Sequence, residues 1–125
     1  MLQGQAATAP EIVCYNVLVR LGYHPDVDFV FQSVQFGGRQ VAGGQVVDFF
    51  FTNPPGLAVG VMGEYFHYRL RGGSRPHDLA ARVELALVGT TLIFIDEDDL
   101  MGAQAEWFVR EALQFRDHSK LARGG

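Results

Sequence analysis

The sequence has 125 residues, which is enough for one domain with a sizeable core and too short for two. Hydrophobic residues make up 48% and charged residues 19%, the composition of an ordinary globular protein. No apolar run approaches the roughly 20 residues that cross a bilayer, and the first residues lack the basic start and apolar stretch of a signal peptide. A single cysteine, Cys14, excludes an internal disulfide and a multi-cysteine zinc site. We therefore expect a soluble, cytoplasmic protein that forms a single domain over residues 1–125.

The net charge is -4, because nine arginines and one lysine are outweighed by 14 carboxylates. Proteins that bind nucleic acid through phosphate contacts usually present a basic surface. The basic residues are nevertheless unevenly placed, since four arginines fall in one short stretch and four acids form a cluster further along. The arginines are Arg69, Arg71, Arg75 and Arg82, and the acids are Asp96, Glu97, Asp98 and Asp99. Local charge can therefore suit DNA, although composition alone does not indicate it.

The first predicted element is a helix that begins after Thr8 and stops at Gly22. Thr8 can cap the helix, Pro10 suits the first turn, and Glu11 has the spacing of a capping box. Apolar residues then recur at helical spacing at Ile12, Tyr15, Leu18 and Val19. Glycine is the residue that most often follows the last turn of a helix.

Three strands are predicted next, over residues 29–36, 45–52 and 57–66. Each is rich in β-branched and aromatic residues, and clusters of glycine and proline separate them. Clusters at these spacings are typical of hairpin turns, so we expect an antiparallel meander.

A glycine- and arginine-rich loop over residues 69–75 precedes a predicted amphipathic helix over 77–88, which stops at Gly89. Residues 90–95 (TTLIFI) show no alternation of apolar and polar positions. Such a run is typical of a buried strand, here expected to lie parallel to a neighbour after the helical crossover.

The acidic cluster precedes a last predicted helix. Asp98 or Asp99 is expected to cap it, and Phe108, Ala112 and Phe115 are expected to share its buried face. An acidic run could bind a cation, but acids at a helix N-terminus are favoured by the helix dipole, and we prefer that interpretation.

Asp48 is the first candidate for chemistry, because it lies in an otherwise apolar strand between Val47 and Phe49. A carboxylate in such a strand must be paired, metal-bound or solvent-facing, and the sequence leaves these alternatives open. The next strand ends in Glu64 and His67, which a hairpin would bring near Asp48. Carboxylate, imidazole and water can hold a Mg²⁺-type cation and position a nucleophile for phosphodiester cleavage. A histidine bonded to the backbone is the alternative for His67.

The order αβββαβ, with acids in the first helix and second strand, resembles the PD-(D/E)XK nuclease superfamily. More narrowly, V-V-D-F-F-F followed by G-E-Y-F-H resembles the very-short-patch repair endonuclease branch. The segment D-L-A-A-R and the later I-F-I-D-E-D-D-L are similar to that branch's second helix and last strand. The resemblance runs from about Thr8 to Leu100. It implies an α/β (α+β) fold with a restriction-endonuclease-like αβββαβ core and a C-terminal helix.

The resemblance also implies a role for each candidate residue. Asp48 matches the metal-binding aspartate of the family, and Glu64 is the second expected metal ligand. His67 matches the histidine that assists the attacking water or the scissile phosphate. Glu11 matches an acid of the first helix that orients a metal-bound water. The implied cofactor is Mg²⁺ or Mn²⁺, and the implied partner is DNA, with Arg69, Arg71 and Arg75 on its phosphates.

Three positions depart from the family pattern, namely Gly60, Met62 and Phe66, the last of which stands in the slot of the superfamily's lysine. We expect either a reduced catalytic site or a fold that survives without catalysis. The leading hypothesis is a metal-dependent DNA endonuclease that nicks or cuts, acting in mismatch or junction processing, phage DNA metabolism or homing. The alternative is an inactive nuclease-fold protein that binds DNA or assembles with another protein. A third is a subunit whose site is completed by a partner chain, including a second copy of itself.

Overall fold

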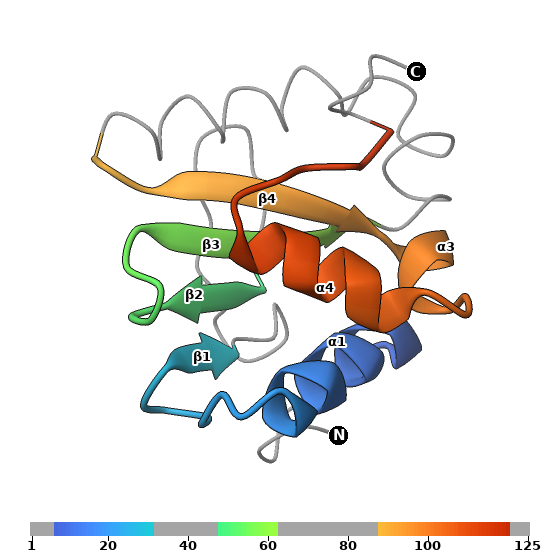
Figure 1. The fold of residues 1–125 in the computed structure, drawn as a ribbon, viewed down its shortest axis with the longest axis horizontal. Helices are drawn as coiled ribbons and strands as arrows, with labels where there is room; N and C mark the ends of the chain where they lie inside the picture. The colour runs from blue at the N-terminus through green and yellow to red at the C-terminus, as the bar shows by residue number, and fades with distance from the viewer. Residues whose placement is uncertain (1–6, 32–47, 63–87, 121–125) are drawn as a thin grey trace.

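The computed structural model describes residues 7–31, 48–62 and 88–120. These residues form a mixed α/β structure with a four-stranded sheet and three helices (Figure 1). The predicted loop over 69–75 and all but the last residue of the predicted helix over 77–88 lie outside them. The elements are α1 (Ala9–Arg20), β1 (Phe29–Phe31), β2 (Phe49–Phe51), β3 (Leu57–Met62), β4 (Thr91–Asp96), α3 (Glu97–Leu100) and α4 (Ala105–Leu113).

The sheet has the strand order β1-β2-β3-β4. The pairs β1–β2 and β2–β3 are antiparallel, which confirms the predicted meander over the described residues. The pair β3–β4 is parallel, with a register that runs from Leu57 opposite Thr91 to Met62 opposite Asp96. The predicted parallel strand is therefore confirmed, and its apolar sequence fits burial on both faces.

Local sequence rules account for both ends of α1. The Thr8 hydroxyl accepts a hydrogen bond from the Glu11 N–H, and the Glu11 carboxylate accepts one from the Thr8 N–H, so the predicted capping box is present. At the other end, Gly22 adopts a positive φ of 96°, and the Tyr23 N–H bonds back to the Leu18 carbonyl. This is the Schellman arrangement, which confirms the predicted stop at Gly22.

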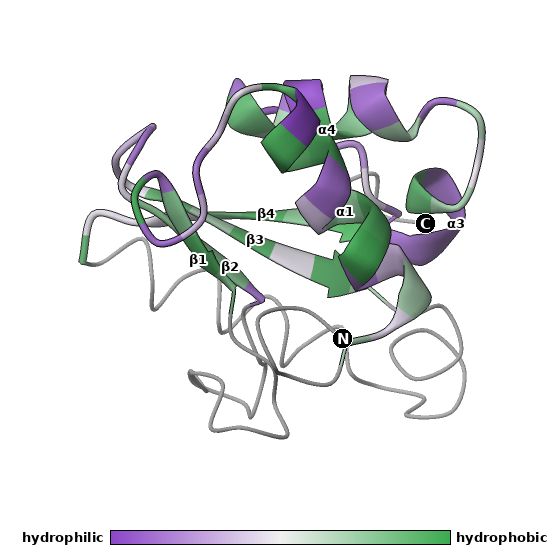
Figure 2. Cartoon of the chain, turned by 90° about the horizontal axis from the view of Figure 1, so that it is seen from below, coloured by the Kyte–Doolittle hydropathy of each residue, from purple (hydrophilic) through white to green (hydrophobic). Residues whose placement is uncertain are grey.

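Helices α1 and α4 lie together over one face of the sheet, and the main core is between these layers (Figure 1). The strands are mostly hydrophobic, as Figure 2 shows in a view from below. Aromatic rings dominate this core, with Phe29 beside Phe49, Phe51 and the edge of Tyr15. The buried stripe of α1 is Cys14, Val17 and Leu18. The predicted stripe was partly wrong, because Val19 is 45% exposed.

The last predicted helix is two helices in the structure. Asp96 is the residue at the N-cap of α3, so the predicted caps Asp98 and Asp99 lie inside its first turn instead. The chain leaves the helix after Leu100, and Gly102, a poor helix former, lies in the break. Phe115 lies beyond the end of α4 with a φ of 63° and is 42% exposed, so it does not share the buried face.

Hydrogen bonds to two carboxylates join residues 114–120, which follow α4, to strand β4. Figure 1 shows this segment passing over β4. The Asp117 Oδ2 accepts a hydrogen bond from the Phe94 N–H at 3.0 Å, and the Asp96 Oδ2 accepts one from the Lys120 N–H at 2.9 Å. Asp96 is buried, and this bond gives its carboxylate a backbone partner. Among the described residues, no helix combines the length and apolar character needed to cross a membrane.

Gly60 of β3 lies opposite Phe94 of β4 in the parallel register, and the Phe94 ring lies close to it. A Cβ atom at this position would meet two carbons of the Phe94 ring at 3.1 Å. Phe94 is only 1% exposed, so its ring has little room to move away. A side chain at position 60 is therefore disfavoured by packing.

We predict that Gly60→Ala destabilises the protein by about 1–3 kcal/mol, the usual result of adding a methyl group to a full core. Chemical denaturation measures this directly. The same substitution in a Phe94→Leu background is the control, and the two changes should couple by about 1 kcal/mol because they share one contact. A gain in stability from Gly60→Ala in the wild-type background would contradict the packing argument.

Candidate acidic site

The candidate site lies where the end of β3, the start of β2 and the first turn of α1 meet, at one end of the sheet (Figure 1). Asp48 immediately precedes β2 and is 7% exposed. The interpretation of Asp48 as a solvent-facing strand residue is therefore wrong, and its carboxyl group must find partners inside the protein.

The first partner of Asp48 is the backbone of β3. The Asp48 N–H donates to the Val59 carbonyl at 3.1 Å, and the Asp48 Oδ2 accepts a hydrogen bond from the Val61 N–H at 2.8 Å. The backbone pairing of β2 with β3 covers Phe49 opposite Val59 and Phe50 opposite Ala58. One residue before these pairs, the Asp48 side chain adds a hydrogen bond to β3 through the Val61 N–H.

The second partner is the side chain of Glu11, which reaches Asp48 from α1. The two carboxyl groups lie within hydrogen-bonding reach of each other. Ionised carboxylates are only acceptors, so this contact requires one shared proton or a cation in its place. Burial raises the pKa of Asp48 well above its ordinary value, and the hydrogen bond and negative charge of Glu11 raise it further. The Val61 N–H opposes this shift by stabilising the carboxylate.

Cys14 lies beside this pair, although no role was predicted for it there. It follows Glu11 by three residues, a spacing that places two side chains on the same helix face and could have indicated the contact. Burial raises the pKa of the Cys14 thiol, and the charges of Asp48 and Glu11 raise it further. The thiolate is the reactive and metal-binding form, so this cysteine is an inert neighbour of the acidic pair.

The remaining predicted site residues, namely Glu64, His67 and the arginines Arg69, Arg71 and Arg75, lie outside the described residues. Within residues 7–31, 48–62 and 88–120, no group of three or more His, Cys, Asp or Glu side chains is placed to hold a metal. The carboxyl groups of Glu11 and Asp48 still offer the oxygen ligands that Mg²⁺ prefers, and Mg²⁺ often takes one or two carboxylates and keeps several waters.

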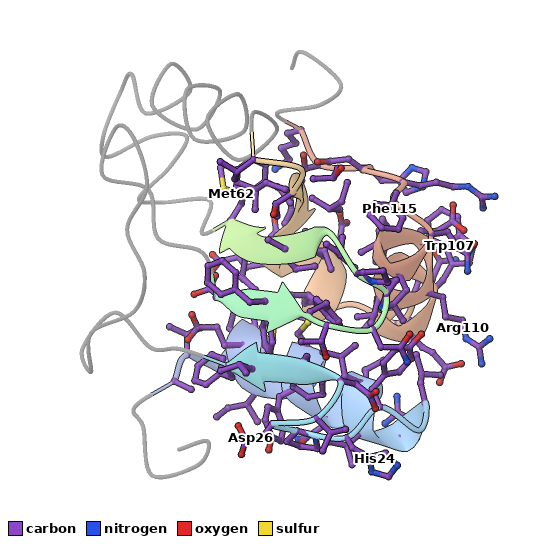
Figure 3. All side chains as sticks on the ribbon, turned by 90° about the vertical axis from the view of Figure 1, so that its left-hand side faces the viewer. His24, Asp26, Met62, Trp107, Arg110 and Phe115 are labelled. Carbon is purple, nitrogen blue, oxygen red and sulfur yellow. The ribbon has the colours of Figure 1, made fainter. Side chains whose placement is uncertain are left out.

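Two of the positions that depart from the pattern of the resembled family, Gly60 and Met62, lie on β3, and packing accounts for the residue at each. At Gly60, the Phe94 ring fills the space that an acidic side chain would need. Met62 is fully buried at the end of β3 and is labelled in Figure 3. Val61 packs against the core under α1 and α4, so Met62 faces the opposite side of the sheet. Hydrophobic packing thus occupies both positions.

Comparison of the chain with models of protein families, with curated proteins and with solved structures finds no match.

We predict that Asp48→Asn stabilises the protein at neutral pH. The folded state holds a proton on Asp48 to a higher pH than the unfolded chain does, since burial and Glu11 raise its pKa. Stability of the wild type should therefore fall as the pH rises from about 4 through the folded pKa, by about 1.4 kcal/mol for each pH unit that separates the unfolded and folded pKa values. Asparagine carries no charge, can accept from the Val61 N–H and can donate to Glu11. The stability of the variant should therefore not fall over this pH range.

Urea denaturation between pH 4 and pH 8 gives the measurement. Asp98→Asn is the matched control, because Asp98 is an exposed acid of α3 and should leave the pH dependence of the wild type unchanged. An Asp48→Asn protein that is less stable than the wild type at pH 7 would show that the fold favours the ionised carboxylate.

Proposed function

We propose that the protein is a metal-dependent DNA endonuclease that hydrolyses phosphodiester bonds through a metal-bound water. The observation that carries the proposal is the contact between the buried carboxyl group of Asp48 and the half-buried Glu11 of α1. A buried carboxyl group that faces a second acid opposes folding when both are ionised, so a purely structural role explains the pair poorly. Perturbed carboxyl groups of this kind gather at functional sites, and a divalent cation would relieve their repulsion.

The arrangement of the described elements supports the same proposal. An α-helix followed by three antiparallel strands and a fourth strand parallel to the third is what the resemblance to the PD-(D/E)XK superfamily leads us to expect. Asp48 at the start of β2 and Glu11 in α1 occupy the positions that the resemblance gives to the metal-binding aspartate and to the acid of the first helix. Glu64 and His67 are the proposed second ligand and the proposed group that assists the attacking water.

In this proposal, Asp48 holds the cation and Glu11 orients a water bound to it. The Val61 N–H fixes one oxygen of Asp48 and so sets the direction from which that carboxylate can bind. A divalent cation held there would supply a bound water of lowered pKa as the nucleophile and positive charge for the scissile phosphate. DNA reaches the site through Arg69, Arg71 and Arg75, which supply the positive charge that the chain as a whole lacks.

A non-catalytic role in binding DNA or in assembling with a protein is the second candidate. It is favoured by the loss of polar side chains at Gly60 and Met62, where packing has replaced them. The hydrogen bond from Val61 to Asp48 also gives that carboxylate a structural use.

We predict that Asp48→Asn abolishes Mg²⁺-dependent cleavage while the fold stays intact, because the amide removes the charge that a hard cation requires. His67→Ala should slow cleavage by about 10²–10⁴-fold, the usual effect of losing one acid–base group. Cleavage of branched, mismatched and single-stranded DNA should be measured with Mg²⁺ and with Mn²⁺. Asp98→Asn, which changes an exposed acid outside the pair, is the control and should cut at the wild-type rate. A wild-type protein that cuts none of these substrates with either metal would contradict the catalytic proposal and favour the non-catalytic role.

We also predict that replacing Arg69, Arg71 and Arg75 together with alanine weakens DNA binding and flattens its dependence on salt. Each neutralised phosphate releases counterions, so on duplex DNA the slope of log affinity against log salt should fall by about 0.9 for each phosphate that the variant no longer neutralises. Fluorescence anisotropy at several salt concentrations gives this slope. A matched triple replacement of Arg20, Arg110 and Arg116, which lie on the helical side of the molecule, should leave the slope unchanged. An unaltered slope for the first variant would show that DNA does not bind through Arg69, Arg71 and Arg75.

A further inference from the structure

We infer that Thr8 is a positioning residue for the acidic pair, which it serves by fixing the carboxylate of Glu11 beside Asp48. The inference rests on the proposed function and names how that site is assembled. The capping box of α1 and the acidic pair share one side chain, that of Glu11, so the cap of the helix and the geometry of the site are linked.

The hydrogen bonds of Glu11 show this link directly. Its Oε1 accepts a hydrogen bond from the Thr8 N–H at 2.8 Å, and its own N–H donates to the Thr8 Oγ1 at 3.4 Å. The same carboxyl group lies within hydrogen-bonding reach of the Asp48 carboxyl group. One carboxylate thus joins the exposed start of the helix to a buried acid.

Without such a restraint, Glu11 would not be expected to stay where it is. A glutamate has three rotatable side-chain bonds and loses conformational freedom when it is ordered. In the first turn of a helix, it could turn into water and still interact favourably with the helix dipole. Facing another acid is unfavourable when both are ionised. The Thr8 N–H holds the carboxylate in place, since a charged acceptor makes a stronger hydrogen bond than a neutral one.

The backbone of Thr8 makes a selective test possible. Its φ of -77° and ψ of 162° suit proline, which has no N–H. Thr8→Pro therefore removes the N–H that holds Glu11, together with the Oγ1 that accepts from the Glu11 N–H, without requiring a new backbone conformation at position 8. Thr8→Ala loses only the hydroxyl and keeps the N–H, so it is the matched control and should keep Glu11 beside Asp48. Thr8→Ser keeps both groups and is the conservative control. Glu11→Gln is the complementary variant, because glutamine also completes a capping box but carries no charge.

Binding of Mn²⁺, measured by calorimetry, and the rate of DNA cleavage are the first readouts. Thr8→Pro should weaken Mn²⁺ binding and slow cleavage by about 10-fold, as expected when a residue that contacts a metal-bound water loses its orientation. Thr8→Ser should stay within about two-fold of the wild type by the same reasoning. Glu11→Gln should retain the thermal stability of the helix but lose as much Mn²⁺ affinity as Thr8→Pro, or more. A Thr8→Pro protein with a lower melting temperature and unchanged Mn²⁺ affinity would overturn the inference and make Thr8 a simple cap.

Crystal structures of the variants test the role of Thr8 independently of the proposed function. We expect the Glu11 carboxylate beside Asp48 in the wild type and in Thr8→Ser, and turned away from it in Thr8→Pro. This readout requires neither metal binding nor cleavage, so it decides the role of Thr8 even if the wild type proves not to be a nuclease. A Glu11 carboxylate that keeps its contact with Asp48 in Thr8→Pro would refute the positioning role.

Discussion

The carboxyl group of Asp48 is held from two directions, and the candidate site depends on both contacts. The Val61 N–H reaches it from β3, and the Glu11 carboxyl reaches it from α1. Strand β3 is fixed by its six-residue parallel pairing with β4, and α1 is fixed by packing on the same sheet. Two rigid elements therefore force two acids together. Contact between the two carboxyl groups requires a proton or a cation between the oxygens, because ionised carboxylates are only acceptors and Asp48 is buried from the water that would screen its charge.

The parts of the fold that depend on neighbours in the sequence could be predicted from it. The capping box needs only Thr8 and Glu11, and the end of α1 needs only a glycine that can adopt a positive φ. The meander follows from turns between apolar runs, and the parallel strand follows from the uniformly apolar residues 92–95. In each case, a local preference agrees with the final structure, as expected of sequences whose local and global preferences are consistent.

The contacts of the site could be predicted only in outline, because they depend on register and on the rotation of a helix. The sequence indicated that Glu11 would approach Asp48, but it could not assign the Val61 N–H, which lies beyond the last backbone pair of β2 with β3. The three-residue spacing from Glu11 to Cys14 was a signal for the place of Cys14 beside the pair, but it does not show which side of α1 faces the sheet. The split of the last helix was missed because a helical pattern of apolar residues does not reveal a short break around Gly102.

The packing of β3 explains why the acids of this site come from α1 and from the residue that precedes β2. At Gly60 the Phe94 ring excludes a side chain, and at Met62 the side chain is buried on the far face of the sheet. Within the described residues, β3 therefore offers the site a backbone N–H, at Val61, and no carboxylate. A cation bound at this site would be held by Asp48 before β2, with Glu11 of α1 on one of its waters and the remaining positions filled by water or by residues that follow β3. The affinity for that cation would then depend on how firmly the first turn of α1 is held, which is why a hydrogen bond at the helix cap can matter to the chemistry.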